Sequence, residues 1–579
     1  MKRLLFSLLG AAALLPASGA QPSGSLPVIY ITTENNQEIT SKEDYVKASY
    51  YLDPNGCEGV SAFGSKDAPL DLQIRGRGNY TWTGFDKKPY RLKLGKKQKL
   101  MGMSSSKHWA LLAHADDNKG FLRNAVGFQL SRLAGLPWTP GDAPVEVVLN
   151  GDYIGLYFLT ETVRVDEKRV NVFDYDSAVE DYEEANPGQT LPWQDDYATG
   201  GWLVEIDNYE DPAQIEFESI DPYVPDPVMR VTYDTPSDYI TDAHKEWLLK
   251  EFRQLDEMII NGDTDECAWQ QKIDMTNLAR FFVVNQLVFN YESFHGSCKL
   301  SRDMGADAKW NFGPVWDFGS AFQTTEDTLL FDYGLYSNHW IKALYQYPAF
   351  VKEVERVYAT LMDGDYDTIY GYIDTFIDTI EEAARADKER WPQYGNENLN
   401  DRAGEVKGML RSSVNYLNRT WHYASATDDQ YTVYFIDFDN AWDDVYVFTW
   451  NPVACGEWPG TQMQRVDPSE IYADPNAAVW KYTFTESAGL PEAGHSGIIF
   501  NNGQSGVEDG NQTIDLIYEH GGIYDRGGIT TGITAPDAAD ELPVEYYDLS
   551  GRRIDSPAAS GIYIRRQGAE VRKVVVNRR

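Results

Sequence analysis

The sequence predicts an α+β protein in three parts: a large mixed domain, a β-sandwich and a short β segment. Three observations predict this order. Strand-like and helix-like patterns of apolar residues alternate between about residues 26 and 425. Short alternating aromatic and polar runs, broken by Gly, Pro, Asn and Asp, fill 430–525. A linker composition at 526–543 then leads to further strand patterns in 544–579.

The mixed domain combines the two periodicities of regular structure. Period-two alternation predicts strands, and apolar residues three and four apart predict helices. The expected strands are 70–75, 90–94, 145–149 and 203–206, and the expected helices are 120–134, 245–260, 278–288 and 369–384. In the sandwich region, the strand patterns are "YTVYFIDF", "VYVFTW", "WKYTFT" and "GIIFNN".

Length, charge and composition exclude several classes of protein. The 579 residues are enough for about three to five domains, or for one large domain with smaller additions. The 51 Lys and Arg against 89 Asp and Glu give a net charge of −38, which disfavours binding to nucleic acid through bulk charge. A hydrophobic content of 42% is that of a globular chain and excludes disorder throughout.

Residues 1–20 have the pattern of a secretory signal peptide. Lys2 and Arg3 precede an apolar run at 4–15, and small residues suit cleavage after Ala20. That run is too short to cross a bilayer comfortably, and no later segment is apolar over about 18 residues. The sequence therefore predicts an exported protein without a membrane span, either periplasmic, at the cell surface or secreted.

Export makes disulfides chemically accessible to the four cysteines, Cys57, Cys267, Cys298 and Cys455. Four cysteines allow three full pairings, and the sequence does not choose between them. Mostly free thiols are an equal alternative. Because none of the cysteines has the close spacing of a zinc site and no HExxH motif is present, we expect no structural zinc.

A positive island interrupts this acidic chain. Ten basic residues and only one acidic residue, Asp86, lie between Ile74 and Lys107. The run "RGRGNYTW" places Gly76 and Gly78 among these cations, and glycines let backbone N–H groups approach a phosphate. The island predicts an anionic ligand, although ion pairs with the acidic remainder would also account for it. It is not a Walker loop, which needs a Gly-Lys-Ser/Thr ending.

Two acidic residues lie 25 positions apart in settings that suit phosphoryl transfer. Glu292 follows Asn290-Tyr291 at the end of an apolar helix, and Asp317 stands in "GPVWDFGSAF" after a turn. Phosphoryl transfer needs one carboxylate near the acceptor hydroxyl and another on the metal. The alternative is that Asp317 caps a turn and Glu292 is a surface charge. Nearby, Arg123 begins a helix after "HADDN", either in a capping segment or beside a phosphate.

With these motifs in order, the first region resembles the CotH kinase family, atypical kinases related to spore-coat proteins. The matching stretches are "RGRGNYTWTGFDKKPYRLKL", "KHWALLAHADDNKGFLRNAVGFQLSRLAGLPWTP", "VEVVLNGDYIGLYFLTETVRV", "GGWLVEID" and "GPVWDFGSAF". The resemblance implies a divergent kinase-like fold that binds ATP with Mg²⁺ or Mn²⁺ and phosphorylates protein Ser or Thr. It implies a metal-binding Asp317, a catalytic Glu292, and further nucleotide-side residues at Arg75, Lys88, Lys93, Arg123 and Glu161, the last as the partner of a Lys.

The sequence departs from the family pattern at two of these places. Glu292 stands where the family usually has Asp, and a displaced carboxylate can cost about a hundredfold in rate. The family's "WDFD" or "WDFN" is "WDFG" here, so Gly319 lacks a polar side chain. A kinase-like scaffold that has lost turnover is therefore the main alternative. A glycoside hydrolase, which would need a paired carboxylate in a sugar cleft, is a third class that abundant acidic residues leave open.

The second and third regions carry resemblances of their own. Region 430–525 resembles a family-26 starch-binding module through "VYFIDFDNAWDDVYVFTW", "EWPGTQM" and "GIIFNNG". Sugar rings pack on exposed aromatic planes, and the resemblance implies an α-glucan or related glycan on Trp442, Tyr446, Phe448 and Trp458. Residues 544–579 are similar to C-terminal segments of exported Bacteroidetes proteins, some of which act as type IX secretion signals. The resulting prediction is an exported kinase held on glycan, acting on an unidentified protein; a non-catalytic glycan-binding or surface-assembly protein is the alternative.

Overall fold

The computed structural model describes residues 19–529 apart from 325–326, 335, 395–397, 422, 424–430, 469–470, 472–476, 486–488 and 508, together with the backbone of four strands between 544 and 576. Nearly all of the expected signal peptide and most of the expected linker lie outside these residues. The chain divides into two compact units, Met1–Gln430 and Tyr431–Arg579. Helices and several sheets occur together, which confirms the α+β class.

A closed barrel forms the N-terminal part of the first unit. Its seven strands join in the order β1-β2-β3-β4-β5-β7-β6, and β6 returns to β1 in parallel. Alternate residues such as Ile74, Leu92 and Trp109 fill the barrel, so their neighbours in sequence point outward. The strands are β1 (Val28–Thr33), β2 (Val46–Asp53), β3 (Leu70–Gly76), β4 (Tyr90–Gln98), β5 (Ser106–Leu112), β6 (Asp142–Leu149) and β7 (Asp152–Glu161).

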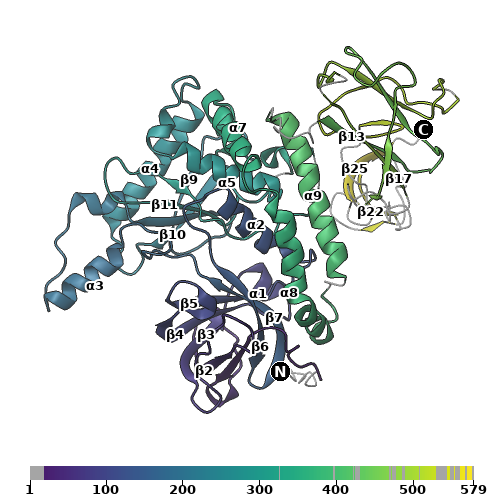
Figure 1. The fold of residues 1–579 in the computed structure, drawn as a ribbon. Coiled ribbons are helices and arrows are strands. Elements are labelled where there is room, and N and C mark those ends of the chain that lie inside the picture. The colour runs from purple at the N-terminus through teal and green to yellow at the C-terminus, as the bar shows by residue number, and fades with distance from the viewer. Residues whose placement is uncertain are drawn as a thin grey trace, which may run out of the picture. The chain divides into compact units, whose positions relative to one another are not determined.

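A second, five-stranded sheet and most of the helices complete the first unit (Figure 1). The sheet order is β12 (Asn311–Phe312), β11 (Cys298–Arg302), β8 (Trp202–Asp207), β10 (Val228–Thr235) and β9 (Gln214–Glu218). Most side chains of α5 are buried, including its apolar residues from Phe281 to Val284 and the amides of Asn285 and Gln286. The main helices are α2 (Leu122–Leu133), α3 (Tyr175–Ala185), α4 (Asp242–Ile260), α5 (Met275–Leu287), α7 (Pro348–Met362), α8 (Thr368–Arg390) and α9 (Leu399–Thr420).

The predicted strands and helices of this unit are confirmed. The four expected strands fall in β3, β4, β6 and β8, and the four expected helices overlap α2, α4, α5 and α8. All four cysteines are free thiols. Of the alternatives left open by the sequence, the structure therefore has free thiols and no disulfide. Among the described residues, no helix combines the length and the apolarity that crossing a bilayer requires.

The second unit contains two sheets that share one apolar core. Val433 and Phe435 from one sheet and Val447 and Phe500 from the other belong to the same buried cluster. The first sheet contains β16 (Gln464–Val466), β17 (Ala478–Thr483), β13 (Thr432–Asp437), β20 (Ile523–Asp525) and β21 (Gly528–Ile529). The other contains β15 (Thr461–Gln462), β14 (Tyr446–Trp450), β18 (Gly497–Asn501) and β19 (Leu516–Ile517).

The last part of the chain forms a separate sheet. Its order is β23 (Arg553–Ile554), β22 (Val544–Tyr547), β24 (Gly561–Gln567) and β25 (Glu570–Val576). All of its pairings are antiparallel.

Candidate functional site

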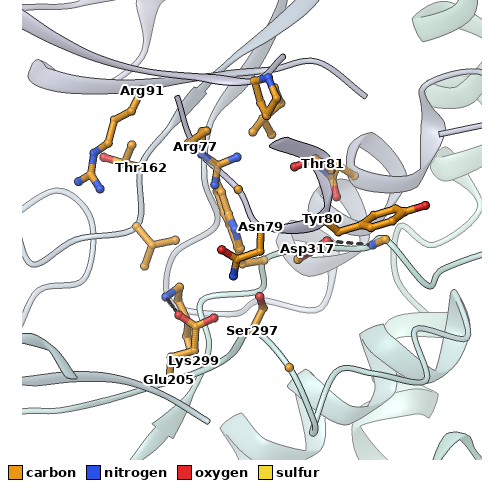
Figure 2. Close-up of a pocket in the computed structure, with 18 of the residues that line it drawn as sticks. Arg77, Asn79, Tyr80, Thr81, Arg91, Thr162, Glu205, Ser297, Lys299 and Asp317 are labelled. Atoms are coloured by element: carbon orange, nitrogen blue, oxygen red, sulfur yellow. Dashed lines mark hydrogen bonds and ion pairs between the residues drawn. The ribbon is translucent and has the colours of Figure 1, made fainter. Parts of the chain in front are cut away.

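A cleft of about 1550 Å³ lies in the first unit, between the barrel and the second sheet. Strands β3, β4 and β5 and the start of α2 contribute to one side, and β8, β10 and β11 contribute to the other. Figure 2 shows cationic side chains from the barrel facing carboxylates from the rest of the unit. The two acidic residues singled out from the sequence, Glu292 and Asp317, both line this cleft.

Asp317 lines the cleft in an unusual backbone conformation. Its φ of 55° lies in the left-handed region, which non-glycine residues seldom adopt outside functional or turn positions. Its Oδ1 accepts a hydrogen bond from the Gly319 amide at 3.1 Å, and the side chain is exposed to the cleft. The neighbouring Phe318 is buried, so the chain turns the carboxylate outward while the ring anchors the loop.

Helix α2 holds this loop in place. Asn124 Oδ1 accepts a hydrogen bond from the Phe318 amide at 3.0 Å, and Arg123 Nη1 donates to the Gly319 carbonyl at 2.8 Å. The Phe318 ring lies directly over Gly127, where an added Cβ would come within 2.5 Å of ring atoms. Helix α2 thus needs a glycine at this position to seat the Asp317 loop.

Replacing Gly127 with Ala should therefore destabilise the first unit and displace the Asp317 loop. Overpacking of this kind costs about 1–3 kcal/mol. The matched control is Gly371→Ala on α8, where no heavy atom lies within 4 Å of the added Cβ. That change should leave stability equal or raise it by up to about 1 kcal/mol, since Ala has the higher helix propensity. Urea unfolding of both variants checks the contrast, and equal stabilities would refute it.

Glu292 lies in a loop that is tied to the Asp317 loop. The Ser320 hydroxyl donates to Asn290 Oδ1 at 2.6 Å and accepts a hydrogen bond from the Glu292 amide at 3.3 Å. Asn290 Nδ2 in turn donates to the Asp317 carbonyl at 3.2 Å. These bonds hold the two loops together, so the positions of the two carboxylates depend on each other.

The carboxylates in this part of the cleft favour a cation. The limited hydration between the cleft walls, with the nearby Asp317, raises the pKa of Glu292. The same effect, with the charge of Asp116, raises the pKa of Asp317, although Arg77 and Arg123 oppose it. Repulsion between acidic groups in one site is relieved when a cation binds.

The donor set fits Mg²⁺ or Mn²⁺ only in part. Carboxylate oxygens are the ligands that these hard cations take. Within the described ranges, no group of three or more His, Cys, Asp or Glu side chains could by itself hold a metal ion. A cation on Asp317 would therefore complete its coordination with water and with phosphate oxygens, as Mg²⁺ commonly does in nucleotide sites.

The outward face of the barrel supplies the cations of the site. Arg75 and Arg91 are cross-strand partners on β3 and β4, and Lys93 follows on the same face of β4. Arg77 comes two residues after Arg75, and its guanidinium lies 5.4 Å from the centre of the Trp316 ring. Burial lowers the pKa of Arg77 to about 10 against the opposing effect of Asp317. The predicted Arg75 and Lys93 thus line the cleft, together with Arg77 and Arg91.

Three predicted nucleotide-side residues have other surroundings. Lys88 does not line the cleft; its Nζ donates to the Trp82 carbonyl, and the neighbouring Lys87 lines the cleft instead. Glu161 does not line the cleft either. Its buried carboxylate forms an ion pair with Arg169 at 3.0 Å, so the prediction that it pairs with a Lys is wrong.

Arg123 does line the cleft, but its side chain already has protein partners. It contacts the Gly319 carbonyl and Asn118, and Asp117 lies 3.9 Å from its Nε. The structure therefore gives it a part in positioning the Asp317 loop.

Opposite the barrel, acidic side chains line the other side of the cleft. Lys299 on β11 donates to Glu205 at 2.6 Å and to Asp234 at 3.0 Å. Although burial opposes it, these two carboxylates raise the pKa of Lys299. Burial and Glu205 raise the pKa of Asp207 to about 6. The cleft is thus divided by charge, with cations on the barrel and an acidic side on the second sheet.

In the second unit, the outer face of β14 carries an aromatic group. Tyr446, Phe448 and Trp450 alternate with buried residues and are partly exposed. Trp458 is 39% exposed, and its ring centre lies 5.4 Å from that of Phe448. Trp450 lies over Gly497, its cross-strand neighbour, which leaves room for the indole. The alternation in "VYVFTW" also indicates that Trp450 shares this face, although the sequence prediction did not include it.

Trp442 is not part of this exposed group. It is only 5% exposed, stacks on Phe435 at 5.3 Å and donates its indole N–H to the Gly510 carbonyl. Its expected place on a sugar-binding surface is wrong, because the ring belongs to the core between the sheets.

Comparison with known proteins gives one family. A family model described as CotH kinase protein matches residues 74–417, which is more than half of the chain. The matched range begins within β3 and ends within α9, and it includes Glu292, Asp317 and most of the lining of the cleft. No curated protein matches the sequence.

Proposed function

The chain belongs to the CotH kinase protein family, and from that premise we propose that the cleft transfers the γ-phosphoryl group of ATP to a Ser or Thr hydroxyl of a protein. The observation that carries the proposal is that Asp317 and Glu292 line the same cleft as a cationic wall, the outward-facing Arg75, Arg91 and Lys93 of β3 and β4. Each of these parts answers one need of phosphoryl transfer: metal ligation, proton acceptance and charge neutralisation.

The proposed division of work follows from position. Asp317 would hold Mg²⁺ or Mn²⁺, which would neutralise charge on the phosphates when bound. Arg77, beside Trp316 and acting on Asp317, would bind phosphate oxygens, with Arg75 and Lys93 further along the same wall. Glu292, whose loop is tied to the Asp317 loop through Ser320 and Asn290, would accept the proton of the acceptor hydroxyl.

Metal-dependent nucleotide binding tests the proposal at its first step. Calorimetry should show the chain binding an unhydrolysable ATP analogue with Mn²⁺. Asp317→Asn should weaken that binding at least about tenfold, as expected for the loss of a charged ligand worth about 1.5–3 kcal/mol. Asp67→Asn, a change at an exposed residue of the β2–β3 connection, is the control for charge. Equal affinities in all three proteins would contradict a metal role for Asp317.

A second candidate function is non-catalytic glycan binding by the second unit, which the aromatic group on β14 favours. We propose that Phe448, Trp450 and Trp458 bind the C–H faces of an α-glucan or related sugar, with Tyr446 at the edge. This activity is compatible with a working kinase or with a scaffold that has lost turnover. Export, a place in the periplasm or at the cell surface, and sorting through the C-terminal segment remain proposals from sequence.

Trp458→Ala should weaken malto-oligosaccharide binding by the full chain by more than about 1 kcal/mol, since a stacked aromatic is worth about that much. Val453→Ala removes an exposed apolar side chain of the same unit that is not part of the aromatic group. It should bind like the unchanged protein. Calorimetric titration with malto-oligosaccharide measures the difference, and an unchanged affinity of the Trp458 variant relative to this control would remove Trp458 from the site.

A further inference from the structure

The cationic wall also carries Arg91, His108 and Thr162, which the proposed transfer does not use, beside Lys93, which it does. Antiparallel pairing puts Lys93 on β4 opposite His108 on β5. Lys93 and His108 are therefore neighbours across the sheet, with strands about 4.8 Å apart. The β5–β7 register pairs Trp109 with Glu161, and Thr162 follows directly after this last pair and lines the same cleft. Arg91 lies on the same face of β4 in the next row.

Three polar atoms of this group are buried without a partner. They are Arg91 Nε, His108 Nδ1 and Thr162 Oγ1. Thr162 is only 9% exposed, yet it lines the cleft. Leaving buried donors unsatisfied costs about 1–3 kcal/mol each. Such atoms on the wall of an open cleft indicate a ligand that satisfies them.

The chemistry of the group points to an anion. Arg91, Lys93 and Arg164 have no carboxylate within ion-pair distance among the described residues. Burial, followed by the charges of Arg164, Arg91, Lys93 and Lys107, lowers the pKa of His108 to about 3. A neutral ligand would leave these cations unpaired, whereas an oxyanion would pair with them and accept from Thr162.

This group is separate from the Asp317 end of the cleft. The main charges that act on Asp317 are Asp116, Arg77 and Arg123, whereas the main charges that act on His108 are Arg164, Arg91, Lys93 and Lys107. In Figure 2, Arg91 and Thr162 stand apart from Asp317, and Arg77 lies between them in the view.

We propose that Arg91, His108 and Thr162 form a second anion subsite in the cleft, which takes a phosphate or carboxylate group beyond the phosphates held near Asp317. The bound oxyanion accepts hydrogen bonds from the guanidinium and the hydroxyl, and the neutral imidazole donates from Nδ1. Lys93 and Arg164 stand at its edge. The group comes either from an anionic acceptor or from a further anionic part of the nucleotide-side ligand.

Inorganic phosphate is the probe that tests this subsite. It is titrated by ³¹P NMR into the full chain, first alone and then with Mg²⁺ and saturating unhydrolysable ATP analogue. Arg91→Gln and Thr162→Val should each weaken phosphate binding about tenfold. Lys96→Gln, which removes an exposed cation of β4 outside the cleft lining, should not. The test measures phosphate binding and not transfer, so the subsite can be established even if the chain transfers no phosphoryl group.

The two sources of the anion give different results with the analogue. If the anion belongs to an acceptor, phosphate still binds when the analogue is bound. If it belongs to the nucleotide, the analogue displaces phosphate and binds about tenfold more weakly to the Arg91 and Thr162 variants. Equal phosphate affinities in the Arg91, Thr162 and Lys96 variants would overturn the proposal. The proposal would also fail if the Arg91 and Thr162 substitutions weakened the binding of adenosine, which carries no phosphate, as much as that of the analogue. These residues would then contact the base or the ribose and not an anion.

Discussion

Replacing Glu292 with Gln is expected to lower phosphoryl transfer about 10²–10⁴-fold, the usual contribution of a general base. The amide keeps the shape of the side chain but cannot accept the hydroxyl proton. The Ser320 bond to the Glu292 backbone amide does not depend on the side chain, so the loop should keep its place. Affinity for the Mn²⁺–ATP analogue should change little, which separates loss of proton acceptance from loss of the site.

Glu292→Asp is the matched variant for this test. It restores the residue type that the family usually has and keeps a carboxylate that can accept the proton, so transfer should stay within about tenfold of the unchanged protein. Rates for both variants come from the initial incorporation of labelled phosphate. A Gln variant as active as the Asp variant would show that Glu292 accepts no proton.

Replacing Lys87 with Met is expected to destabilise the first unit by about 3–5 kcal/mol, as breaking a buried ion pair does. Lys87 is 1% exposed, and its Nζ lies 2.7 Å from Asp387 Oδ1 on α8 and donates to the Leu156 carbonyl. Asp387 also accepts from the Leu156 amide, so the pair joins β7 to α8. Without the cation, a buried carboxylate is left uncompensated.

The pH dependence of this loss has a definite sign. Burial raises the pKa of Asp387, whereas Lys87 opposes the rise. Removing Lys87 should raise that pKa further. A carboxyl with a folded pKa above its unfolded value costs stability as the pH rises through the folded pKa. The deficit of the Lys87 variant should therefore be larger at pH 8 than at pH 5.

Two controls accompany the urea unfolding curves. The double variant Lys87→Met with Asp387→Leu should recover much of the loss, because no lone charge remains buried. Arg385→Met breaks an exposed pair with Glu381 on the same helix and should change stability by less than about 1 kcal/mol. A Lys87 variant as stable as the Arg385 variant would contradict the account of this pair.

The regular elements could be predicted from sequence because their periodicity is local. Alternation in "LDLQIRG" and "YRLKL" marks β3 and β4, and also determines that Arg75, Arg91 and Lys93 share a face. Strand β7 was harder to predict: "DYIGLYFLTE" is buried throughout and lacks alternation. Local sequence setting indicates Glu292 and Asp317 as candidates, but their roles come from the family resemblance, since spacing alone does not bring residues 25 apart together.

The remaining site assignments depend on contacts between distant segments. Nothing in "DKKPY" says which lysine turns inward, and the structure turns Lys87 towards Asp387, 300 residues later in the chain. Likewise, Glu161 meets Arg169 only after the chain leaves β7 and returns. Trp442 looks like its aromatic neighbours in sequence, but the turn after β13 brings it over Phe435.

Transfer of the γ-phosphoryl group is the most direct measurement of the central claim. The full chain is incubated with γ-labelled ATP, Mn²⁺ and a generic protein acceptor, beside Asp317→Asn and the exposed Asp67→Asn control. We expect label on protein Ser or Thr with the unchanged protein and with the Asp67 variant, and none with the Asp317 variant. Absence of label in all three, from protein that binds the Mn²⁺–ATP analogue, would contradict a working kinase and leave a nucleotide-binding scaffold.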